Sequence, residues 1–176
     1  MLIKMLRNGL LAAFLLVVFV GNIFAQDHTL TPVDRELPSF SLSGADGELY
    51  DPDTLKGKTW LINFWAVWCA PCLEELPSLN RAWTKLQDHD VGMLAINIGE
   101  DAEKIELFLK DNDLSIDFPI VIGDKIRTLG NWSARALPHT VVVSPQGKVV
   151  FEAVGPREWD DQRLIDAIVA LNSSEN

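Results

Sequence analysis

The sequence predicts an α/β fold in which a central mixed β-sheet is flanked by helices. Two observations predict it. Between residues 60 and 122, apolar runs of strand length alternate with segments that carry apolar residues at helical spacing, which is typical of parallel neighbouring strands. Nearer the C-terminus, two apolar runs are separated by a turn too short for a parallel crossover. With 176 residues, of which 48% are hydrophobic, the chain is long enough for one domain with a full core.

The first 25 residues are set apart from this fold. Lys4 and Arg7 precede residues 10–24, an almost purely apolar stretch, and Ala25 offers a small residue for cleavage. This order is typical of an export signal. The stretch is shorter than the about 20 residues that a membrane-spanning helix needs, but signals and anchors overlap in length. The segment is therefore predicted to be either a signal peptide that is cleaved after Ala25 or a membrane anchor.

The mature chain begins with a polar stretch and a hairpin. Residues 26–36 are predicted to be a flexible lead-in to a domain that covers residues 37–172. Apolar residues flank Asp46 and Gly47, and an Asp-Gly pair favours the tight loop of a β-hairpin. The nearly continuous apolar run at residues 60–65 is typical of a strand that is covered on both faces.

A helix is predicted directly after this strand. Leucine and tryptophan side chains recur there at three- and four-residue intervals between positions 73 and 86, which gives one apolar stripe. Pro71 fits the first turn of such a helix, because no backbone N–H is needed there. Pro77 lies inside the same stripe and is expected to kink the helix.

The remaining elements continue the alternation and end in a second hairpin. In chain order they are a strand at 92–98, a helix at 105–112, a short apolar segment at 118–122, a short helix at 125–132, strands at 140–144 and 149–154, and a final helix at 164–171 with Asp160 or Asp161 as its cap.

The charge balance excludes one class of partner. The chain holds 25 acidic and 15 basic residues and has a formal net charge of −10. Such a surface repels nucleic acid and anionic lipid headgroups. Nucleic-acid binding is therefore not expected.

The chemistry is expected at the two cysteines of the chain, Cys69 and Cys72. A disulfide across so short a loop constrains the unfolded chain little, so this pair favours redox chemistry over stabilisation. Cys69 stands where the strand passes into the helix, and the positive helix N-terminus favours its thiolate, the species that attacks a disulfide. Cys72 lies one turn further and is predicted to be the resolving thiol. Trp68 and Pro71 are expected to shape the rim.

Metal binding is the principal alternative for this pair, beside an inert pair. A zinc site needs four ligands, and the chain offers no second cysteine pair and three histidines in all. No metal or other cofactor is therefore predicted. A copper-handling thiol protein stays open as an alternative, because two thiolates are soft ligands for Cu(I).

The string from Asn63 to Cys72 (Asn-Phe-Trp-Ala-Val-Trp-Cys-Ala-Pro-Cys) resembles the active-site segment of the thioredoxin superfamily. Continued to Pro77, it resembles the exported TlpA/ResA-like branch, which shares the spacing Cys-x-x-Cys-x-x-Glu-x-Pro. The resemblance spans residues 35–172. It implies a thioredoxin-like fold with an N-terminal β-hairpin and an inserted segment around residues 102–122.

The resemblance also implies roles for single residues. Cys69 would be the attacking thiol and Cys72 its buried partner. Glu75 matches an acidic residue that lies near the dithiol and influences its proton transfers, and Pro138 matches a cis-proline that faces the dithiol. A cis Pro138 would leave the backbone of Leu137 free to pair with an extended substrate, as in strand addition.

Glu75 also has a physical interpretation of its own. It follows Cys72 by three residues and shares a helix face with it. If the apolar stripe covers Glu75, burial raises the pKa of its carboxyl and lets it exchange protons near neutrality. An exposed charge is the alternative, with Glu74 equally available. Thioredoxin carries a buried aspartate at the position of Asn63, which cannot titrate, so the proton role is expected to move to Glu75. His139 could tune the thiols, but a solvated side chain is the favoured expectation.

These observations predict a periplasmic thiol–disulfide oxidoreductase, exported and then soluble or anchored to the inner membrane. Its expected activity is the reduction or exchange of disulfides in exported proteins, with a membrane electron donor to restore the dithiol. The resemblance suggests apocytochrome c among the substrates. A dithiol oxidase is an alternative, because the direction of electron flow depends on the redox potential. A peroxidase is disfavoured, because Ala66 stands where peroxidases of this superfamily carry threonine.

Overall fold

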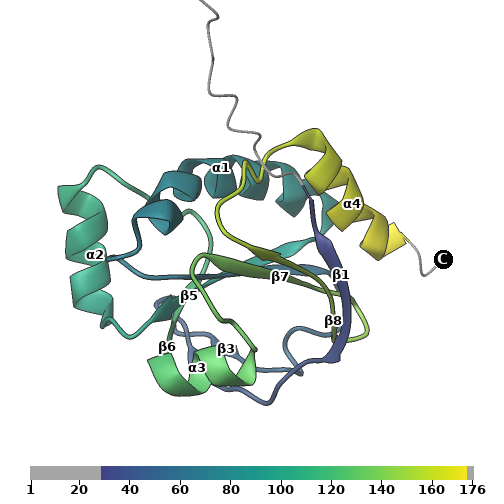
Figure 1. Cartoon of the computed structure of the whole chain (residues 1–176), viewed down its shortest axis with the longest axis horizontal. Coiled ribbons are helices and arrows are strands. Elements are labelled where there is room, and N and C mark those ends of the chain that lie inside the picture. The colour runs from purple at the N-terminus through teal and green to yellow at the C-terminus, as the bar shows by residue number, and fades with distance from the viewer. Residues whose placement is uncertain (1–28, 174–176) are drawn as a thin grey trace, which may run out of the picture.

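The structure, a computed structural model, describes residues 29–173. Its main sheet has six strands in the order β1-β8-β7-β4-β5-β6, and β2 and β3 form a separate hairpin (Figure 1). The strands are β1 (Thr31–Glu36), β2 (Leu42–Ser43), β3 (Leu49–Tyr50), β4 (Trp60–Trp65), β5 (Gly92–Ile98), β6 (Ile120–Gly123), β7 (His139–Val143) and β8 (Lys148–Val154). The helices are α1 (Ala70–Leu86), a 3-10 turn at Gln87–His89, α2 (Ala102–Asp111), α3 (Lys125–Asn131) and α4 (Gln162–Ser173).

The sheet is mixed, as predicted. Strands β4, β5 and β6 are parallel neighbours, joined by crossovers that contain α1 and α2. Strands β7 and β8 form an antiparallel hairpin, and β7 also pairs antiparallel with β4. The segment predicted to be inserted, residues 102–122, supplies α2 and most of β6, and so extends the sheet at one edge. The fold class and the elements predicted from the first hairpin onward are confirmed, with small shifts in their ends.

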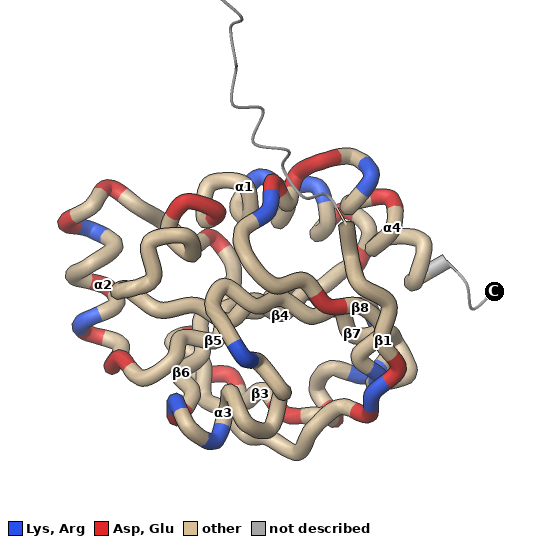
Figure 2. Tube along the Cα trace, viewed as in Figure 1, with Lys and Arg blue, Asp and Glu red and all other residues tan. Residues whose placement is uncertain are grey.

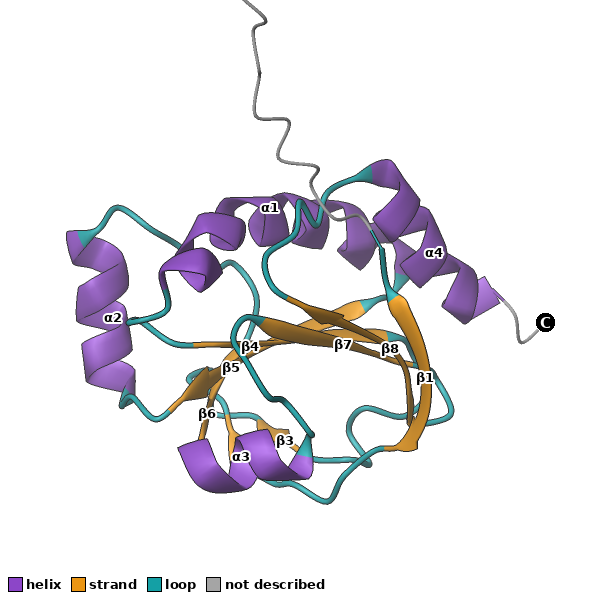
Figure 3. Cartoon of the chain, in the orientation of Figure 1, coloured by secondary structure: helices purple, strands orange, loops and turns teal. Residues whose placement is uncertain are grey.

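Helices cover both faces of the sheet. Figure 3 shows α1 and α4 on one face and α3 with the β2–β3 hairpin on the other. Because successive side chains of a strand point to opposite faces, β4 contributes to two cores. Leu61 and Trp65 pack under α1 and α4, whereas Ile62 and Phe64 pack toward α3, and all four are fully buried. The site lies at the end of β4, where this doubly covered strand passes into α1.

One predicted boundary is wrong. Residues 26–36 were expected to form a flexible lead-in, but Thr31–Glu36 is the edge strand β1, which pairs antiparallel with β8. Its charged side chains suggested a solvated segment, yet Arg35 forms an ion pair with Glu152 of β8 at 2.6 Å. An edge strand is hydrogen-bonded on one side only and needs few apolar residues. Its partner lies 117 positions further along the chain, so no local pattern could reveal it.

Helix α1 starts at the predicted place and continues through Pro77 as one helix. Cys69 is its N-cap residue, with an extended backbone, and Pro71 lies in its first turn. Within residues 29–173, no helix is both long and apolar enough to cross a membrane. The predicted signal or anchor, residues 1–25, lies outside the residues that the structure describes.

Candidate active site

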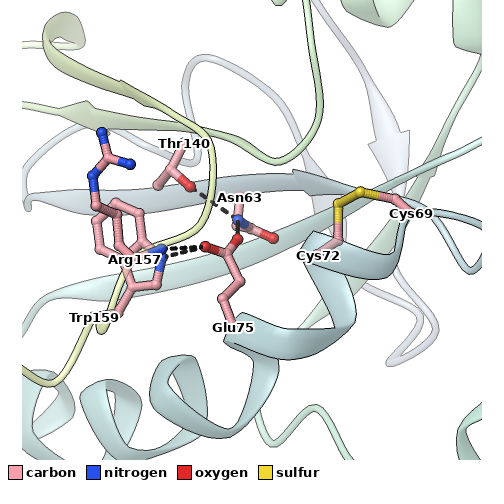
Figure 4. The surroundings of a disulfide bond; sticks show 7 residues. All are labelled: Asn63, Cys69, Cys72, Glu75, Thr140, Arg157 and Trp159. Atoms are coloured by element: carbon pink, nitrogen blue, oxygen red, sulfur yellow. Dashed lines mark hydrogen bonds between the residues drawn. A yellow bond between two sulfur atoms is a disulfide. The ribbon is translucent and has the colours of Figure 1, made fainter. Parts of the chain in front are cut away.

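Cys69 and Cys72 are joined by a disulfide at the start of α1 (Figure 4). The carbonyl of Cys69 accepts hydrogen bonds from the backbone N–H groups of Cys72 (3.0 Å) and Leu73 (3.2 Å). The sulfur of Cys69 therefore stands at the positive end of the helix, which stabilises a thiolate once the bond is reduced. Cys69 is 6% exposed and Cys72 is 0% exposed, so the first cysteine alone meets the surface.

A groove opens beside Cys69. It is lined by Trp68, Cys69, Ala70, Pro71, Leu129, Arg135, Ala136 and Leu137. One wall is thus the start of α1, and the other is the segment between α3 and β7. The side chain of Trp68 is 58% exposed on the rim, and Lys125 of α3 lies over its ring at 5.1 Å. Of the predicted rim and substrate-binding residues, Trp68, Pro71 and Leu137 are brought together here.

Pro138 stands next to this groove. The Leu137–Pro138 peptide bond is cis, as the resemblance implied. The carbonyl of Pro138 accepts a hydrogen bond from the N–H of Gly155 (2.9 Å), which ties it to the segment after β8. Leu137, which precedes Pro138, lines the groove on the wall opposite the start of α1.

Glu75 lies one turn beyond Cys72 and is 2% exposed, whereas Glu74 is exposed. Its Oε2 accepts hydrogen bonds from the N–H of Arg157 (3.1 Å) and from Nε1 of Trp159 (2.9 Å). Burial raises the pKa of Glu75 to about 7, although these hydrogen bonds act in the opposite direction. The carboxyl can therefore gain or lose a proton near neutral pH.

Asn63 connects Glu75 to the sheet. Its Nδ2 donates to Oε1 of Glu75 (2.8 Å) and to Oγ1 of Thr140 in β7 (2.9 Å). Its Oδ1 has no hydrogen-bond partner among the described residues. Figure 4 shows the amide between the carboxylate and the threonine. An amide at this position holds Glu75 in place and carries no charge of its own.

The segment between β8 and α4 completes the site, and the sequence did not indicate this. Trp159 is fully buried, and its ring N–H and the backbone N–H of Arg157 both point at Glu75 (Figure 4). A tryptophan within the polar stretch Pro-Arg-Glu-Trp-Asp-Asp was the one local signal that could have drawn attention to it.

This segment is fastened along one face of α1. The backbone N–H of Trp159 donates to Oγ of Ser78 (3.1 Å). One turn further, Nε of Arg81 lies 2.7 Å from Oδ2 of Asp160, and Nζ of Lys85 donates to the carbonyl of Asp160 (2.7 Å). The donors that fix Glu75 are thus held by contacts at successive turns of the same helix.

The comparisons with known proteins agree with this geometry. The model of the Redoxin family matches residues 32–168 of the chain. The chain belongs to the Redoxin family. The thiol-disulfide oxidoreductase ResA of Geobacillus thermodenitrificans is 34% identical to this redoxin over 152 residues, which cover 86% of each chain. The ResA protein of Bacillus cereus is 29% identical over 159 residues, which cover 86% of this chain and 91% of that one.

Solved structures share the fold. A thiol:disulfide interchange protein of the thioredoxin family from Chlorobium tepidum matches with a TM-score of 0.62 and 26% identity, over 81% of this chain and 99% of that one. A secreted thiol-disulfide isomerase from Corynebacterium glutamicum matches with a TM-score of 0.67 and 22% identity, over 85% and 98%. With its Cys-x-x-Cys disulfide, the redoxin is a TlpA/ResA-like thiol–disulfide oxidoreductase of the thioredoxin superfamily.

The expectation for His139 is wrong. Its side chain is 2% exposed rather than solvated, and neither ring nitrogen has a hydrogen-bond partner among the described residues. His139 and Thr140 are successive residues of β7, so their side chains point to opposite faces of the sheet. The ring of His139 therefore points to the face of α3, away from Glu75, and its centroid lies 5.9 Å from that of Phe64. The polar residue type suggested exposure, but β7 is covered on both faces and buries every side chain.

Burial of His139 in the redoxin predicts a loss of stability in acid. Desolvation lowers the pKa of His139 below 6.5, so the unfolded chain binds a proton more readily than the folded one. Stability is therefore intact above pH 6.5 and falls below it, by up to about 1.4 kcal/mol per pH unit. His139→Phe should remove this component. Urea unfolding of both proteins between pH 5 and 8 measures it. A difference in unfolding free energy between the two proteins that does not change with pH would contradict the prediction.

Among residues 29–173 of the redoxin, no three side chains of histidine, cysteine, aspartate or glutamate are grouped so that they could hold a metal ion.

Proposed function

We propose that the protein reduces or exchanges disulfides of exported proteins, with Cys69 as the attacking thiol and Cys72 as the resolving thiol. The observation that carries this proposal is the unequal access of the two sulfurs. Cys69 borders the groove, whereas Cys72 is fully buried behind it. A partner that binds in the groove therefore meets Cys69 first.

The exchange consists of two substitutions at sulfur. The Cys69 thiolate attacks one sulfur of the substrate disulfide, a mixed disulfide forms, and the other substrate sulfur leaves as a thiolate that takes up a proton. Cys72 then loses its proton and attacks Cys69, which releases the second substrate sulfur. Two electrons and two protons pass from the dithiol to the substrate, and the Cys69–Cys72 disulfide remains. A membrane electron donor then restores the dithiol.

Glu75 is proposed to take the proton of Cys72 in the second step. It is one turn away on the same helix, buried in the same core, and its pKa of about 7 divides it between the two protonation states at neutral pH. A base is effective when its pKa lies near the working pH. With Asn63 at its side instead of a titratable residue, Glu75 is the ionisable group that the network around it holds in place.

The rim residues are proposed to hold an extended substrate segment. The backbone of Leu137 would pair with that segment beside Pro138, while Trp68 and Pro71 would contact its side chains. The groove lined by Leu137, Trp68 and Pro71 supports this arrangement.

The proposed place of action is the periplasm. The order of charged, apolar and small residues in segment 1–25 supports export, and a retained segment 10–24 would keep the protein at the inner membrane. Apoproteins of cytochrome c are proposed among the substrates, on the similarity to the ResA proteins. Mass analysis of the mature N-terminus distinguishes a cleaved protein from one that retains segment 1–25, because cleavage after Ala25 would leave Gln26 as the first residue.

Trapping tests the proposed roles of the two cysteines. Cys72→Ser should hold its partners as mixed disulfides on Cys69, because no second thiol can release them. Cys69→Ser is the matched control and should trap none, since its remaining thiol is buried. Non-reducing gels and mass spectrometry of cell extracts measure both. Equal trapping by the two variants would contradict the assignment.

The redox potential tests the direction of electron flow. Equilibration of the purified protein with glutathione buffers should give a reducing potential, well below the about −120 mV of a strong oxidant. A potential near that value would contradict the proposed reductase activity and support the alternative of a dithiol oxidase.

A further inference from the structure

One stretch of this acidic chain carries no acid. Residues 125–151 contain no aspartate or glutamate, although the whole chain has 25 of them and a formal net charge of −10. The same stretch includes α3, the segment after it and β7, and so it forms one complete wall of the groove beside Cys69. Lys125, Arg127 and Arg135 lie on this wall, and Figure 2 shows the blue segments on α3.

One of these cations lines the groove, and a second lies at its rim. Arg135 lines it together with Leu129 and Leu137, and Lys125 lies over the ring of Trp68 on its rim. Neither cation forms an ion pair with a carboxylate in the described part of the chain. Elsewhere several exposed cations do form such pairs, and Arg81 with Asp160 is one example.

The carboxylates closest in sequence to the groove form no ion pair with Lys125 or Arg135 in the described part of the chain. Asp124 precedes α3, and its Oδ1 accepts a hydrogen bond from the N–H of Arg127 (2.9 Å). Glu74 is exposed on α1, one turn beyond Pro71, and is not among the residues that line the groove. The wall formed by residues 125–151 thus presents two cations that have no carboxylate partner among the described residues, beside an apolar surface.

We propose that the groove binds an extended protein segment that carries a carboxylate side chain beside its reactive cysteine, and that Arg135 and Lys125 select that carboxylate. This inference rests on the proposed function and names a substrate class for the same site. A guanidinium offers two parallel donors to a carboxylate. Arg135 precedes Leu137 by two residues, which is about 7 Å of extended chain, so a strand paired with Leu137 would bring a residue flanking its cysteine to Arg135.

The position of these charges predicts which kinetic parameter should differ between substrates. Charges on the rim of an interface act mainly on the association rate and on the rejection of wrong partners. The preference for acidic segments should therefore appear in the second-order rate constant of the reduced protein with its substrate. It should weaken as salt screens the charges, with a Debye length of about 10 Å at 0.1 M.

Three synthetic peptides test this selection. Each carries one cysteine bound as a mixed disulfide to mercaptoethanol, and the residues on both sides of that cysteine are Glu, Gln or Lys. The reduced protein converts each peptide to its free thiol and mercaptoethanol and is itself oxidised to the Cys69–Cys72 disulfide. At low ionic strength we expect the second-order rate constant of this single turnover to be roughly tenfold higher for the Glu peptide than for the Lys peptide, with the Gln peptide between them. In about 0.5 M salt the ratio should approach one.

Charge reversal locates the effect. Arg135→Glu should invert the preference, so that the Lys peptide reacts faster. Lys104→Glu in α2 is the matched control: it makes the same change in net charge at an exposed position outside the groove, and it should keep the preference for Glu. Equal rates for the three peptides at low salt, or an unchanged preference in Arg135→Glu, would overturn the proposal.

A neutral small disulfide separates this inference from the proposed function. Bis(2-hydroxyethyl) disulfide has no charge for Arg135 or Lys125 to select. Its reduction at equal rates by the parent and Lys104→Glu would show that the dithiol works, so that equal rates for the three peptides would then contradict the selection alone. Failure of the reduced parent to react with this disulfide and with every peptide would instead contradict the proposed function.

Discussion

Glu75→Gln should make the oxidised protein more stable than the parent by about 1–3 kcal/mol above pH 7. Burial raises the pKa of Glu75 from 4.5 in the unfolded chain to about 7 in the fold. Below pH 4.5 the carboxyl is protonated in both states and costs nothing. As the pH rises from 4.5 to 7, the unfolded chain loses the proton first, so the parent loses stability progressively. Glutamine does not titrate, and the variant should not show this loss.

Glutamine also fits the hydrogen bonds at this position. Its oxygen can accept from the N–H of Arg157 and from Nε1 of Trp159, as Oε2 of Glu75 does. Its amide would then face Nδ2 of Asn63, which is also a donor. Rotation of the Asn63 amide removes this clash of two donors, because it exchanges Nδ2 for Oδ1, which is without a partner in the described structure. Oδ1 could then accept from the glutamine amide and from the hydroxyl of Thr140.

The same substitution should slow the exchange reaction. If Glu75 takes the proton of Cys72, its loss removes general base catalysis, which contributes about 100-fold or more where it operates. The second step, the release of substrate from Cys69, should therefore slow at neutral pH, and the thiol titration curves should change.

Guanidinium unfolding from pH 4 to 9 and single-turnover kinetics measure these two effects. Glu74→Gln is the matched control, since it removes the neighbouring exposed carboxylate and should leave both the stability profile and the rate unchanged. If Glu75→Gln behaves like this control, the role assigned to Glu75 is wrong.

Trp159→Phe should move the pH midpoint of the Glu75-dependent step upward by about one pH unit. The ring N–H of Trp159 is the first of the hydrogen bonds that hold the pKa of Glu75 down against the effect of burial. A hydrogen bond to a charged group is worth about 1.5–3 kcal/mol, and 1.4 kcal/mol corresponds to one pH unit. Without this donor the protonated carboxyl is favoured, so a higher pH is needed to ionise it.

The smaller ring should also lower the stability of the fold, by about 1–3 kcal/mol, because it leaves space in a fully buried position. Trp132→Phe separates the two effects. Trp132 is 1% exposed and packs on Phe40 and Phe64, on the face of the sheet away from Glu75. This control should lose stability to a similar extent and keep the parent's pH midpoint. A shift of the midpoint in both variants, or in neither, would contradict the assignment of Trp159 as a residue that positions Glu75.

Local patterns were sufficient for the reactive pair and for the elements that carry it. The spacing of Cys69 and Cys72, the apolar run before them and the helical stripe after them are all features of one continuous segment. The burial of Glu75 could be predicted in the same way, because a residue three positions after Cys72 shares its helix face. These inferences succeeded because they depend on contacts between residues that are near one another in sequence.

The errors and omissions concern contacts between distant residues. Polarity suggested a lead-in at Thr31–Glu36 and a solvated His139, but pairing with β8 orders the first, and coverage on both faces of β7 buries the second. Residue type alone does not decide burial in a sheet, because the neighbouring strands and the layers on each face decide it.

The sequence by itself thus determined the dithiol, its place at a helix N-terminus and the α/β class, since a helical period, a strand period and a short spacing are local properties. The tertiary structure decided the protonation of Glu75. The donors from Arg157 and Trp159 come from a segment 82 and 84 residues away. They reach the carboxylate because β8 returns beside β7 and the segment that follows is fastened along α1. The balance between the cost of desolvating Glu75 and these hydrogen bonds sets its pKa, and that balance exists only in the folded chain.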